Sequence, residues 1–282
     1  DIIPKTKNIL IANKESIICG WNLIEKKLIK SQTRFIPIDS EHFSIWSLLN
    51  KNDFKNIDKI VLTASGGPFL KKPINSLANI KPKIALKHPN WKMGKKISID
   101  SSTMMNKIFE YIEAKKIFNL KKKNISILIH PTSYVHALIF FKNGIIKLAA
   151  HKPKMKIPIS SAMNLNNYIN KNQINKSLKS LNNLKFELPN IKKFPLMAII
   201  PLIPEKQSYF ETILITLNDN LVERYLNNQI NYVSINKNLL KIIKNQYFIK
   251  YYKLKPKNIC DIKNMIKLTK KYLDINIKYY DK

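Results

Sequence analysis

Two acidic side chains, Asp39 and Glu41, stand two positions apart directly after a predicted strand. In an extended segment, side chains at positions i and i+2 point to the same side. Two neighbouring carboxylates repel each other, and a hard divalent cation between them relieves that repulsion. The spacing therefore fits a metal site. An ordinary acidic loop has the same spacing, so the pair alone leaves both interpretations open.

A second group of polar side chains falls on one face of a predicted helix. Asn106, Glu110 and Glu113 follow one another at i, i+4 and i+7, and Lys107 borders that face. A carboxylate, an amide and an ammonium suit a metal ion together with a phosphorylated ligand. The alternative is a solvated helix face with i, i+3 ion pairs, which is a common arrangement.

The chain contains only 5 glycines, and two of them, Gly66 and Gly67, follow a predicted strand and Ser65. A sequence so poor in glycine is expected to keep it where the backbone geometry requires it. A Ser-Gly-Gly turn offers backbone N–H groups and a hydroxyl to an anion. A simple tight turn is the alternative interpretation.

Histidine and tryptophan side chains in predicted loops are further candidates. The polar segment His88-Pro89-Asn90-Trp91-Lys92-Met93-Gly94 carries a Trp that is unfavourable to expose unless it covers something. A lid over a ligand is one interpretation, and a Trp packed on the core is the other. His130 is a candidate for polarising a substrate or orienting a neighbour, or else a structural histidine.

Hydrophobic patterning gives the elements that must position these groups. Apolar runs of strand length alternate with apolar residues at helical spacing along the first half of the chain. Strand, helix and strand at the N-terminal end predict a parallel αβ unit. The expected strands are 7–12 (short and buried), 34–38, 59–63, 125–129 and 134–141, the expected helices are 16–30 and 102–118, and Asn143-Gly144 is expected to form a hairpin turn.

The second half of the chain has a different character. Residues 164–184 are rich in Asn and Lys and predict a linker or a loosely structured crossing, and the pattern is helical from residue 196 onward. Apolar residues recur at helical spacing after Asp261, which we expect to be an N-cap. The predicted fold class is an α/β catalytic domain (α+β character), 39–163, followed by a linker, 164–192, and an α-helical C-terminal domain, 193–282.

Composition excludes several classes of protein. No apolar run reaches the roughly 18 residues of a membrane span, so no membrane partner is expected, and two cysteines fit a reducing compartment. The formal net charge is +32. The chain has 50 basic residues, of which 2 are arginines (Arg34 and Arg224) and the other 48 are lysines. Scattered lysines favour compositional bias and a solvated surface over a nucleic-acid partner, since nucleic-acid readers rely on arginine. The chain opens with Asp rather than Met, which suggests either a start inside a longer protein or an unusual gene start.

The order of the motifs is more specific than any one of them, and it resembles 1-deoxy-D-xylulose 5-phosphate reductoisomerases from residue 9 to about 140. The motifs that carry the resemblance are Ala12-Asn13-Lys14-Glu15-Ser16, Asp39-Ser40-Glu41-His42, Ser65-Gly66-Gly67-Pro68-Phe69, the segment from His88 to Ile97, the segment from Asp100 to Lys107, Glu110-Tyr111-Ile112-Glu113-Ala114 and Ile129-His130-Pro131.

The resemblance implies an enzyme of the non-mevalonate isoprenoid pathway that rearranges a phosphorylated 1-deoxyketose and reduces the product with NADPH. It implies that Asp39, Glu41 and Glu110 bind Mg²⁺ or Mn²⁺ and that Lys14 and His88 join them as catalytic residues. The remaining assignments implied are phosphate binding by Ser65, Ser101, Asn106 and Lys107, substrate contact by Lys14, Ser40, Glu41, His88 and Glu110, a lid containing Trp91 and Met93, and NADPH contact by Asn13, Glu15, Met93, Gly94 and Met155.

The sequence also departs from the family pattern. The Gly-rich turn of a dinucleotide-binding fold is missing, so the resemblance implies that residues 1–38 are the last strand and helix of a Rossmann-like NADPH-binding domain. A Gly-Glu-x-x-Met-Arg-Thr-Pro stretch is replaced by residues 151–158, and an Asn-Ala-Ala-Asn-Glu motif is reduced to Asn218-Asp219-Asn220.

A homodimer in a bacterial cytoplasm or a plastid-type stroma is the family expectation. The alternative is a catalytically decayed, basic binding protein that keeps the fold. Asp39, Glu41 and Glu110 persist among only 18 acidic residues, which favours the enzyme.

Overall fold

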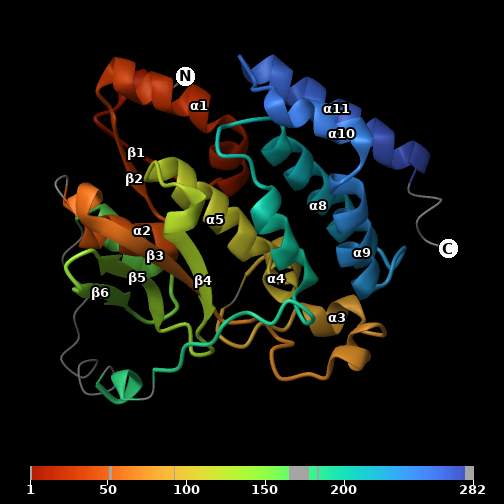
Figure 1. Cartoon of the computed structure of the whole chain (residues 1–282), viewed down its shortest axis with the longest axis horizontal. Helices are drawn as coiled ribbons and strands as arrows, with labels where there is room; N and C mark the ends of the chain where they lie inside the picture. Colours follow the sequence, from red (N-terminus) through yellow and green to blue (C-terminus); the bar gives the residue numbers. More distant parts are fainter. Residues whose placement is uncertain (1, 51–52, 92, 165–177, 183, 277–282) are drawn as a thin grey trace.

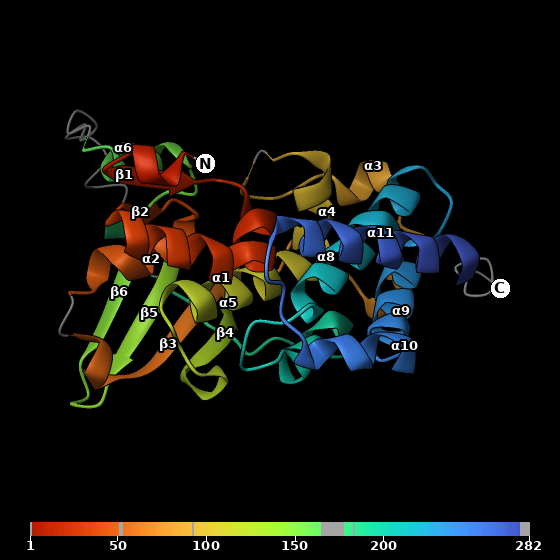
Figure 2. The same ribbon diagram turned by 90° about the horizontal axis from the view of Figure 1, so that it is seen from above.

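The computed structural model of the chain describes residues 2–50, 53–91, 93–164, 178–182 and 184–276. The main sheet has four strands. Figures 1 and 2 show this sheet on one side of the molecule and the C-terminal helices on the other, with helix α5 between them. This arrangement matches the predicted class of a mixed α/β part followed by a helical part.

The N-terminal segment forms the predicted parallel αβ unit. A 3-10 turn, η1 (Ile3–Lys5), precedes β1 (Asn8–Ile11), α1 (Lys14–Ser31) and β2 (Arg34–Pro37), and the two strands pair in parallel. The Asn13 side chain caps α1 by accepting a hydrogen bond from the Ser16 N–H at 2.7 Å. The prediction that the first strand is buried was wrong, because the residues of β1 are exposed or half-buried.

The central sheet has the strand order β4-β3-β5-β6. Strands β3 and β4 are parallel, whereas β5 is antiparallel to both β3 and β6. The predicted hairpin turn lies between β5 and β6, where Gly144 has φ +85°. The bounds of the strands and of the short turns beside them are η2 (Asp53–Asn56), β3 (Ile57–Ala64), η4 (Lys122–Asn124), β4 (Ile125–Ile129), β5 (Val135–Phe141) and β6 (Ile146–Ala150).

The predicted helix 102–118 corresponds to α5 (Met105–Ile117) and to the last two residues of a separate helix, α4 (Lys95–Thr103). They meet at Met104, whose φ of 66° is left-handed and interrupts the helical backbone. The sequence pattern missed α4 because several of its buried positions are polar, including Ser98 and Asp100. Burial of polar side chains removes the apolar periodicity on which a helix prediction depends.

The remaining helices cover the sheet and form the C-terminal part. Their bounds are α2 (Ser40–Leu48), η3 (Ile74–Leu77), α3 (Pro82–Ala85), α6 (Lys156–Ala162), η5 (Pro195–Leu202), α8 (Phe210–Leu226), α9 (Tyr232–Ile243), α10 (Gln246–Ile249), η6 (Lys250–Lys253) and α11 (Ile259–Asn276). The predicted N-cap at Asp261 was wrong, because α11 starts at Ile259. Asn258 takes the capping role, since its side chain accepts a hydrogen bond from the Asp261 N–H at 3.0 Å.

One hydrophobic core runs from the sheet into the C-terminal helices. Ile60 and Leu62 of β3, Ile108 of α5, and Leu214 and Leu217 of α8 are completely buried in it. In the part of the chain that the structure describes, no helix has the length and apolarity needed to cross a bilayer.

Polar contacts reinforce the junction of α4 with the C-terminal helices. Asn218 Nδ2 donates to Asp100 Oδ1 at 2.7 Å, and the Tyr232 hydroxyl donates to the Ser102 carbonyl at 2.8 Å. The C-terminal helices therefore support the helix that follows the 88–94 loop.

The predicted linker 164–192 lies partly outside the described residues, which omit 165–177 and 183. In its described part, Glu187 forms an antiparallel bridge with Ile129 at the end of β4. The bridge ties the end of the segment at Glu187 to the sheet, whereas most of the stretch predicted to be a linker or a loosely structured crossing, 164–184, lies outside the described residues.

The turn after β3 requires glycine at Gly67. Its φ is +66°, and a Cβ placed there would lie 2.8 Å from the Ser101 carbonyl oxygen and 3.0 Å from the Ser102 Cα. Gly144 has a similar φ of +85°, but a Cβ there would meet nothing within 4 Å. Alanine at either position would have a strained backbone, but only alanine at Gly67 would also clash with neighbouring atoms. Comparing the two substitutions therefore separates the loss of stability caused by strain from the loss caused by the clash.

We expect Gly67→Ala to lower the free energy of unfolding by more than about 2 kcal/mol and Gly144→Ala by about 1 kcal/mol, since both strain φ but only the first also produces a clash. Urea denaturation followed by circular dichroism measures both. Equal losses in the two variants would contradict a close approach of the turn to α4.

Candidate active site

A cavity of about 170 Å³ opens where β3 ends and the Ser-Gly-Gly turn begins. Its walls come from the start of α1, the start of α2, the 88–94 loop, the α4–α5 junction and β5. The predicted residues that line it are Lys14, Asp39, Ser40, Glu41, Ser65, His88, Trp91, Met93, Ser101, Asn106, Lys107, Glu110 and Met155. The structure thus brings every predicted substrate-binding and metal-binding residue to one cavity.

Asp39 and Glu41 converge there, although not for the reason that the sequence suggested. The segment is not extended: Asp39 is the N-cap residue of α2 and Glu41 lies in the first helical turn. The Asp39 side chain makes no capping hydrogen bond, so its carboxylate is left for other partners. The Ser40 hydroxyl donates to Glu41 Oε2 at 2.5 Å and orients that carboxylate.

The predicted face of α5 supplies the third carboxylate. Asn106 Nδ2 donates to Glu110 Oε1 at 2.5 Å, one turn along the helix. Oxygens of Asp39, Glu41 and Glu110 all lie within 4.8 Å of one another. That limit fits oxygen ligands around a single hard divalent ion, which are about 3 to 5 Å apart at ligand distances of 2.0 to 2.6 Å, depending on the angle between them.

Two lysines stand among these carboxylates. Lys14 Nζ lies 2.7 Å from Asp39 Oδ2, and it also contacts Glu110 and Glu113. Lys107 Nζ lies 2.5 Å from Glu41 Oε1 and pairs with Glu110 as well. Four carboxylates and two ammonium groups leave an excess of two negative charges when all are ionised, which one divalent cation would balance. The residues therefore fit a divalent metal ion.

The electrostatics of the cluster shift several pKa values. Burial lowers the pKa of Lys14, but the charges of Asp39, Glu110 and Glu113 outweigh burial and raise it well above its ordinary value. Burial raises the pKa of Glu110 to about 7, and the charge of Glu41 adds to that rise. Burial also raises the pKa of Glu113 well above its ordinary value, although the charge of Lys14 opposes the rise.

Hydrogen bonds around Ser65 prepare the opposite wall for an anion. Burial lowers the pKa of His88 to about 4, so its ring is neutral at pH 7. Its Nδ1 accepts from the backbone N–H groups of Asn90 and Trp91 at 3.1 and 3.0 Å, which places the ring proton on Nε2. Nε2 then donates to Ser65 Oγ at 3.1 Å, and the Gly67 N–H donates to the same oxygen at 3.0 Å. With two bonds accepted, the Ser65 hydroxyl proton is left to donate into the cavity.

The described residues on either side of Lys92, namely His88, Trp91 and Met93, contribute to the wall of the cavity. Asn90 Nδ2 donates to the Pro131 carbonyl and to Ser133 Oγ, at 2.8 and 2.9 Å. The Trp91 ring meets the His136 ring edge to face, with centroids 6.2 Å apart. Trp91 lines the cavity, as the lid interpretation expected, and it also packs on β5, as the alternative expected.

A second cavity of about 590 Å³ adjoins the first and shares Lys14, Asp39, Asn106 and Met155 with it. Glu15 and Gly94, both predicted to contact the cofactor, line this second cavity, together with apolar side chains such as Ile38 and Ile97. Of the other predicted cofactor residues, Met93 lines only the first cavity. Asn13 lines neither and is engaged as the cap of α1.

Sequence reasoning gave no role to His136, a histidine that the structure brings to the site. His136 lines the first cavity, its Nε2 lies 3.1 Å from the His151 carbonyl oxygen, and its ring stacks on that of His151 with centroids 3.8 Å apart. A histidine within the apolar run of β5 was the available signal. His130 is structural, because it is fully buried with both ring nitrogens within hydrogen-bond distance of the Lys185 carbonyl and Thr132.

Sequence reasoning also missed Lys96. Its ammonium contacts Glu15 of α1 at 2.8 Å, Asp219 of α8 at 3.0 Å and Asp100 of α4 at 3.2 Å. Three elements that are remote in sequence are joined at this one side chain, which no local pattern could reveal.

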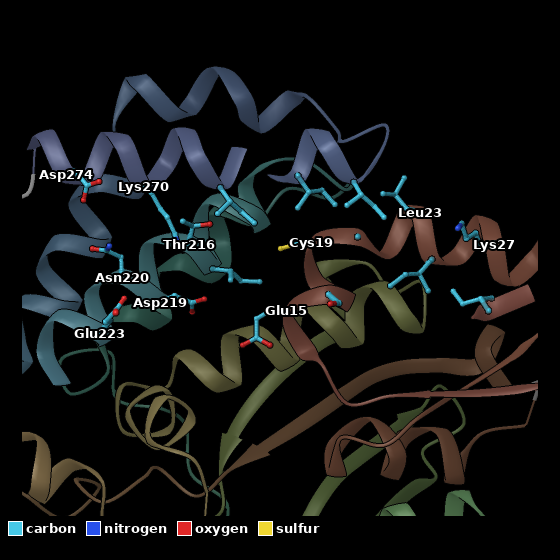
Figure 3. A pocket seen from close by; sticks show the side chains of 18 residues that line it. Glu15, Cys19, Leu23, Lys27, Thr216, Asp219, Asn220, Glu223, Lys270 and Asp274 are labelled. Atoms are coloured by element: carbon cyan, nitrogen blue, oxygen red, sulfur yellow. The ribbon is translucent and has the colours of Figure 1, made fainter. Parts of the chain in front are cut away.

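A third cavity, of about 620 Å³, lies between α1, α8 and α11 (Figure 3). Its wall is mainly apolar, from Leu23, Ile24 and Ile262 among others, and its labelled carboxylates include Glu15 and Asp219. Because both of these are paired with Lys96, they do not form a free polar cluster there. The chemistry of the molecule is concentrated in the first cavity.

A three-carboxylate cluster, an adjoining wall of hydroxyl, amide and ammonium groups, and a neighbouring apolar cavity define a metal-dependent enzyme for a small phosphorylated substrate. Two family models match this chain: the 1-deoxy-D-xylulose 5-phosphate reductoisomerase C-terminal domain at residues 35–118 and the DXP reductoisomerase C-terminal domain at residues 151–272. The chain belongs to the 1-deoxy-D-xylulose 5-phosphate reductoisomerase family.

Curated relatives support this assignment. The 1-deoxy-D-xylulose 5-phosphate reductoisomerase of Pelagibacter ubique is 52% identical over 265 residues, which cover 94% of this chain and 68% of the relative. The Clostridium perfringens enzyme is 38% identical over 83% of this chain and 61% of its own length. The chain thus spans roughly two thirds of the length of these relatives.

Solved structures show the same fold. A DOX-P reductoisomerase in complex with NADPH, fosmidomycin and magnesium has a TM-score of 0.88 and 33% identity, covering 98% of this chain and 71% of that one. The Zymomonas mobilis reductoisomerase in complex with NADPH has a TM-score of 0.81 and 27% identity, over 95% of this chain and 68% of that one.

We expect Mn²⁺ to bind more tightly as the pH rises from about 6 to about 8, because burial and the charge of Glu41 raise the pKa of Glu110 to about 7 and the metal must displace that proton. The affinity should change by up to about tenfold per pH unit below pH 7 and less above it. Isothermal titration calorimetry across this range tests it. An affinity that is constant or falls with rising pH would refute the claim that Glu110 binds the metal by giving up a proton.

Proposed function

We propose that this chain supplies the metal-binding and substrate-binding parts of a 1-deoxy-D-xylulose 5-phosphate reductoisomerase. That enzyme converts 1-deoxy-D-xylulose 5-phosphate and NADPH to 2-C-methyl-D-erythritol 4-phosphate in the non-mevalonate isoprenoid pathway. The observation that carries the proposal is the convergence of Asp39, Glu41 and Glu110 within 4.8 Å, in the same cavity as Ser65 and Lys107.

The proposed roles follow from the positions of the side chains. Asp39, Glu41 and Glu110 hold Mg²⁺ or Mn²⁺, which when bound supplies a Lewis acid to two substrate oxygens. Ser65 donates its hydroxyl proton to the phosphate, and Lys107 offers its charge to it. Ser101 and Asn106 line the same wall and complete the phosphate site. Ser40 orients Glu41, and Lys14, His88 and Trp91 contact the substrate and exclude water.

NADPH is proposed to enter the second cavity, with its nicotinamide end near Met155 and Gly94. Glu15 also lines this cavity. Asn13 and Met93 directly precede two further lining residues, Lys14 and Gly94. The β1-α1-β2 unit, within residues 1–38, is proposed to be the end of a Rossmann-like domain. A catalytic domain at 39–163, a linker at 164–192 and a helical domain at 193–282 complete the proposed organisation.

We expect Glu110→Gln to abolish turnover, by about 10³-fold or more, because the metal loses a charged ligand. The assay follows NADPH consumption with 1-deoxy-D-xylulose 5-phosphate and Mn²⁺, for the chain alone and for the chain joined to the part of the Pelagibacter ubique relative that it does not cover. Glu205→Gln, at an exposed carboxylate that pairs with Lys115, is the matched control. Wild-type activity in Glu110→Gln, or no activity in the joined protein beside an active relative, would sink the proposal.

The competing function, a decayed basic binding protein, predicts salt-sensitive binding to duplex DNA near physiological ionic strength. The carboxylate cluster argues against it, because four converging acidic side chains repel the phosphate backbone that a basic nucleic-acid-binding surface attracts. Reductoisomerase activity further implies a cytoplasmic or plastid-stroma location.

A homodimer is also proposed, and β6 supports it. This edge strand of the sheet and the turn before it carry Ile145, Ile146 and Leu148 at 55%, 52% and 40% exposure. An exposed apolar edge strand is a favourable surface for a second copy.

We expect Ile146→Lys to shift the protein from dimer to monomer in size-exclusion chromatography with light scattering, since a lysine there would place a charge within the apolar contact. Ile249→Lys, at an isoleucine of 40% exposure on α10, should leave the dimer intact. A monomeric wild type, or a dimer that survives Ile146→Lys, would contradict the role given to β6.

A further inference from the structure

Lys14 occupies the position that a metal ion would need. Its ammonium lies 2.7 Å from Asp39 Oδ2, 2.9 Å from Asn106 Oδ1 and 3.3 Å from Glu110 Oε1. Two of these partners are proposed metal ligands. A divalent cation bound by Asp39 and Glu110 would therefore meet the ammonium at close range, and the two positive charges would repel each other strongly in a buried site.

Lys107 faces the same conflict, because it pairs with Glu41 and Glu110. Its alternative partner is the substrate phosphate, which the proposed function places on the wall that it lines. Lys14 has no such role at the phosphate. A buried ammonium that loses its carboxylates needs a new counter-charge.

Glu113 is the carboxylate that can provide it. It lies one helical turn beyond Glu110, is 1% exposed, and its Oε2 is 3.7 Å from Lys14 Nζ. Among the described residues, this oxygen has no hydrogen-bond partner. Glu113 Oε2 is therefore a buried acceptor that lies near Lys14 without a hydrogen bond. Such an unpaired acceptor lowers the stability of the fold unless it gains a partner in another state of the protein.

His42 does not meet this need. Its Nε2 lies 2.9 Å from the Glu110 carbonyl oxygen, so Nε2 carries the ring proton. Nδ1 then presents only a lone pair, 3.9 Å from Glu113 Oε2. Among the described residues, Lys14 is the only lysine or arginine that pairs with Glu113.

We propose that Glu113 is a positioning residue that receives the Lys14 ammonium when a divalent cation takes Asp39 and Glu110. The ammonium need move only about 1 Å to reach the ~2.8 Å of a charge-assisted hydrogen bond. Glu113 would then hold Lys14 beside the metal-bound substrate, so the exchange of partners couples metal loading to the placement of a catalytic group. This inference rests on the proposed function and names a device within the same site.

The test is Mn²⁺ affinity of the chain, measured by calorimetry and by the loss of the free Mn²⁺ spin-resonance signal. We expect Glu113→Gln to weaken Mn²⁺ binding about tenfold, within the range of coupling between contacting residues, because Lys14 then stays on the metal ligands. Glu113→Asp, which keeps the charge on a shorter stem, should weaken it less. Glu205→Gln is the matched control and should leave the affinity unchanged.

A double-mutant cycle with Lys14→Met separates positioning from a merely structural role. Without an ammonium to relocate, Glu113→Gln should change Mn²⁺ affinity less than about twofold. Circular dichroism confirms that each variant is folded, and Glu113→Asp replaces Glu113→Gln in the cycle if the latter is not.

Each contrary result has a distinct meaning. Wild-type affinity in Glu113→Gln, or an equal loss with and without Lys14, overturns the inference. Binding of two Mn²⁺ ions, one of them lost in Glu113→Gln, also overturns it and points to a second metal centre at Asp39, His42 and Glu113. A wild-type chain that binds no Mn²⁺ defeats the proposed function itself, which distinguishes the two failures.

Discussion

The imbalance of buried charge at the α1–α2–α5 junction is the constraint on which the site depends. Among the described residues, Asp39, Glu41, Glu110 and Glu113 pair with two ammonium groups, those of Lys14 and Lys107. Carboxylates buried at this density are tolerated when they are paired, protonated or bound to metal. The two lysines pair with all four carboxylates, and burial, with the charge of Glu41 beside it, raises the pKa of Glu110 to about 7.

The scaffold holds this cluster by bringing together the ends of elements. Lys14 opens α1, Asp39 precedes α2, Ser65 follows β3, and Lys107 and Glu110 lie at the start of α5. Side chains at the ends of elements can face a common cavity while the bodies of those elements pack in the core. Lys96 adds rigidity from outside, since its contacts join α1, α4 and α8 just after the loop that helps to line the site.

Much of the site could be predicted from sequence because its chemistry is local within each motif. The face shared by Asn106, Glu110 and Glu113 follows from helical spacing, and the structure confirms that face, because one side chain, Lys14, contacts all three residues. The convergence of Asp39 and Glu41 was correct, but the extended backbone invoked for it was wrong because α2 begins between them. The order of the motifs, rather than any pattern within one, indicated the family.

The features that could not be predicted from the sequence depend on contacts between distant segments or on single backbone angles. The break between α4 and α5 rests on the left-handed φ of Met104, a residue whose type gives no warning of it. His136 belongs to the site only because β5 pairs with β3, and Lys96 depends on a helix more than a hundred residues away.

The break at Met104 has one more consequence. Ser101 precedes it, Asn106 and Glu110 follow it, and all three line the same cavity. Each residue of an α-helix turns the following side chains by about 100°. One inserted or deleted residue between Met104 and Glu110 would swing the α5 carboxylates away from Asp39 while leaving every side chain chemically intact. The number of residues in this stretch therefore matters more for the site than the identity of most of them. An insertion or deletion there would disrupt the carboxylate cluster more than many substitutions would.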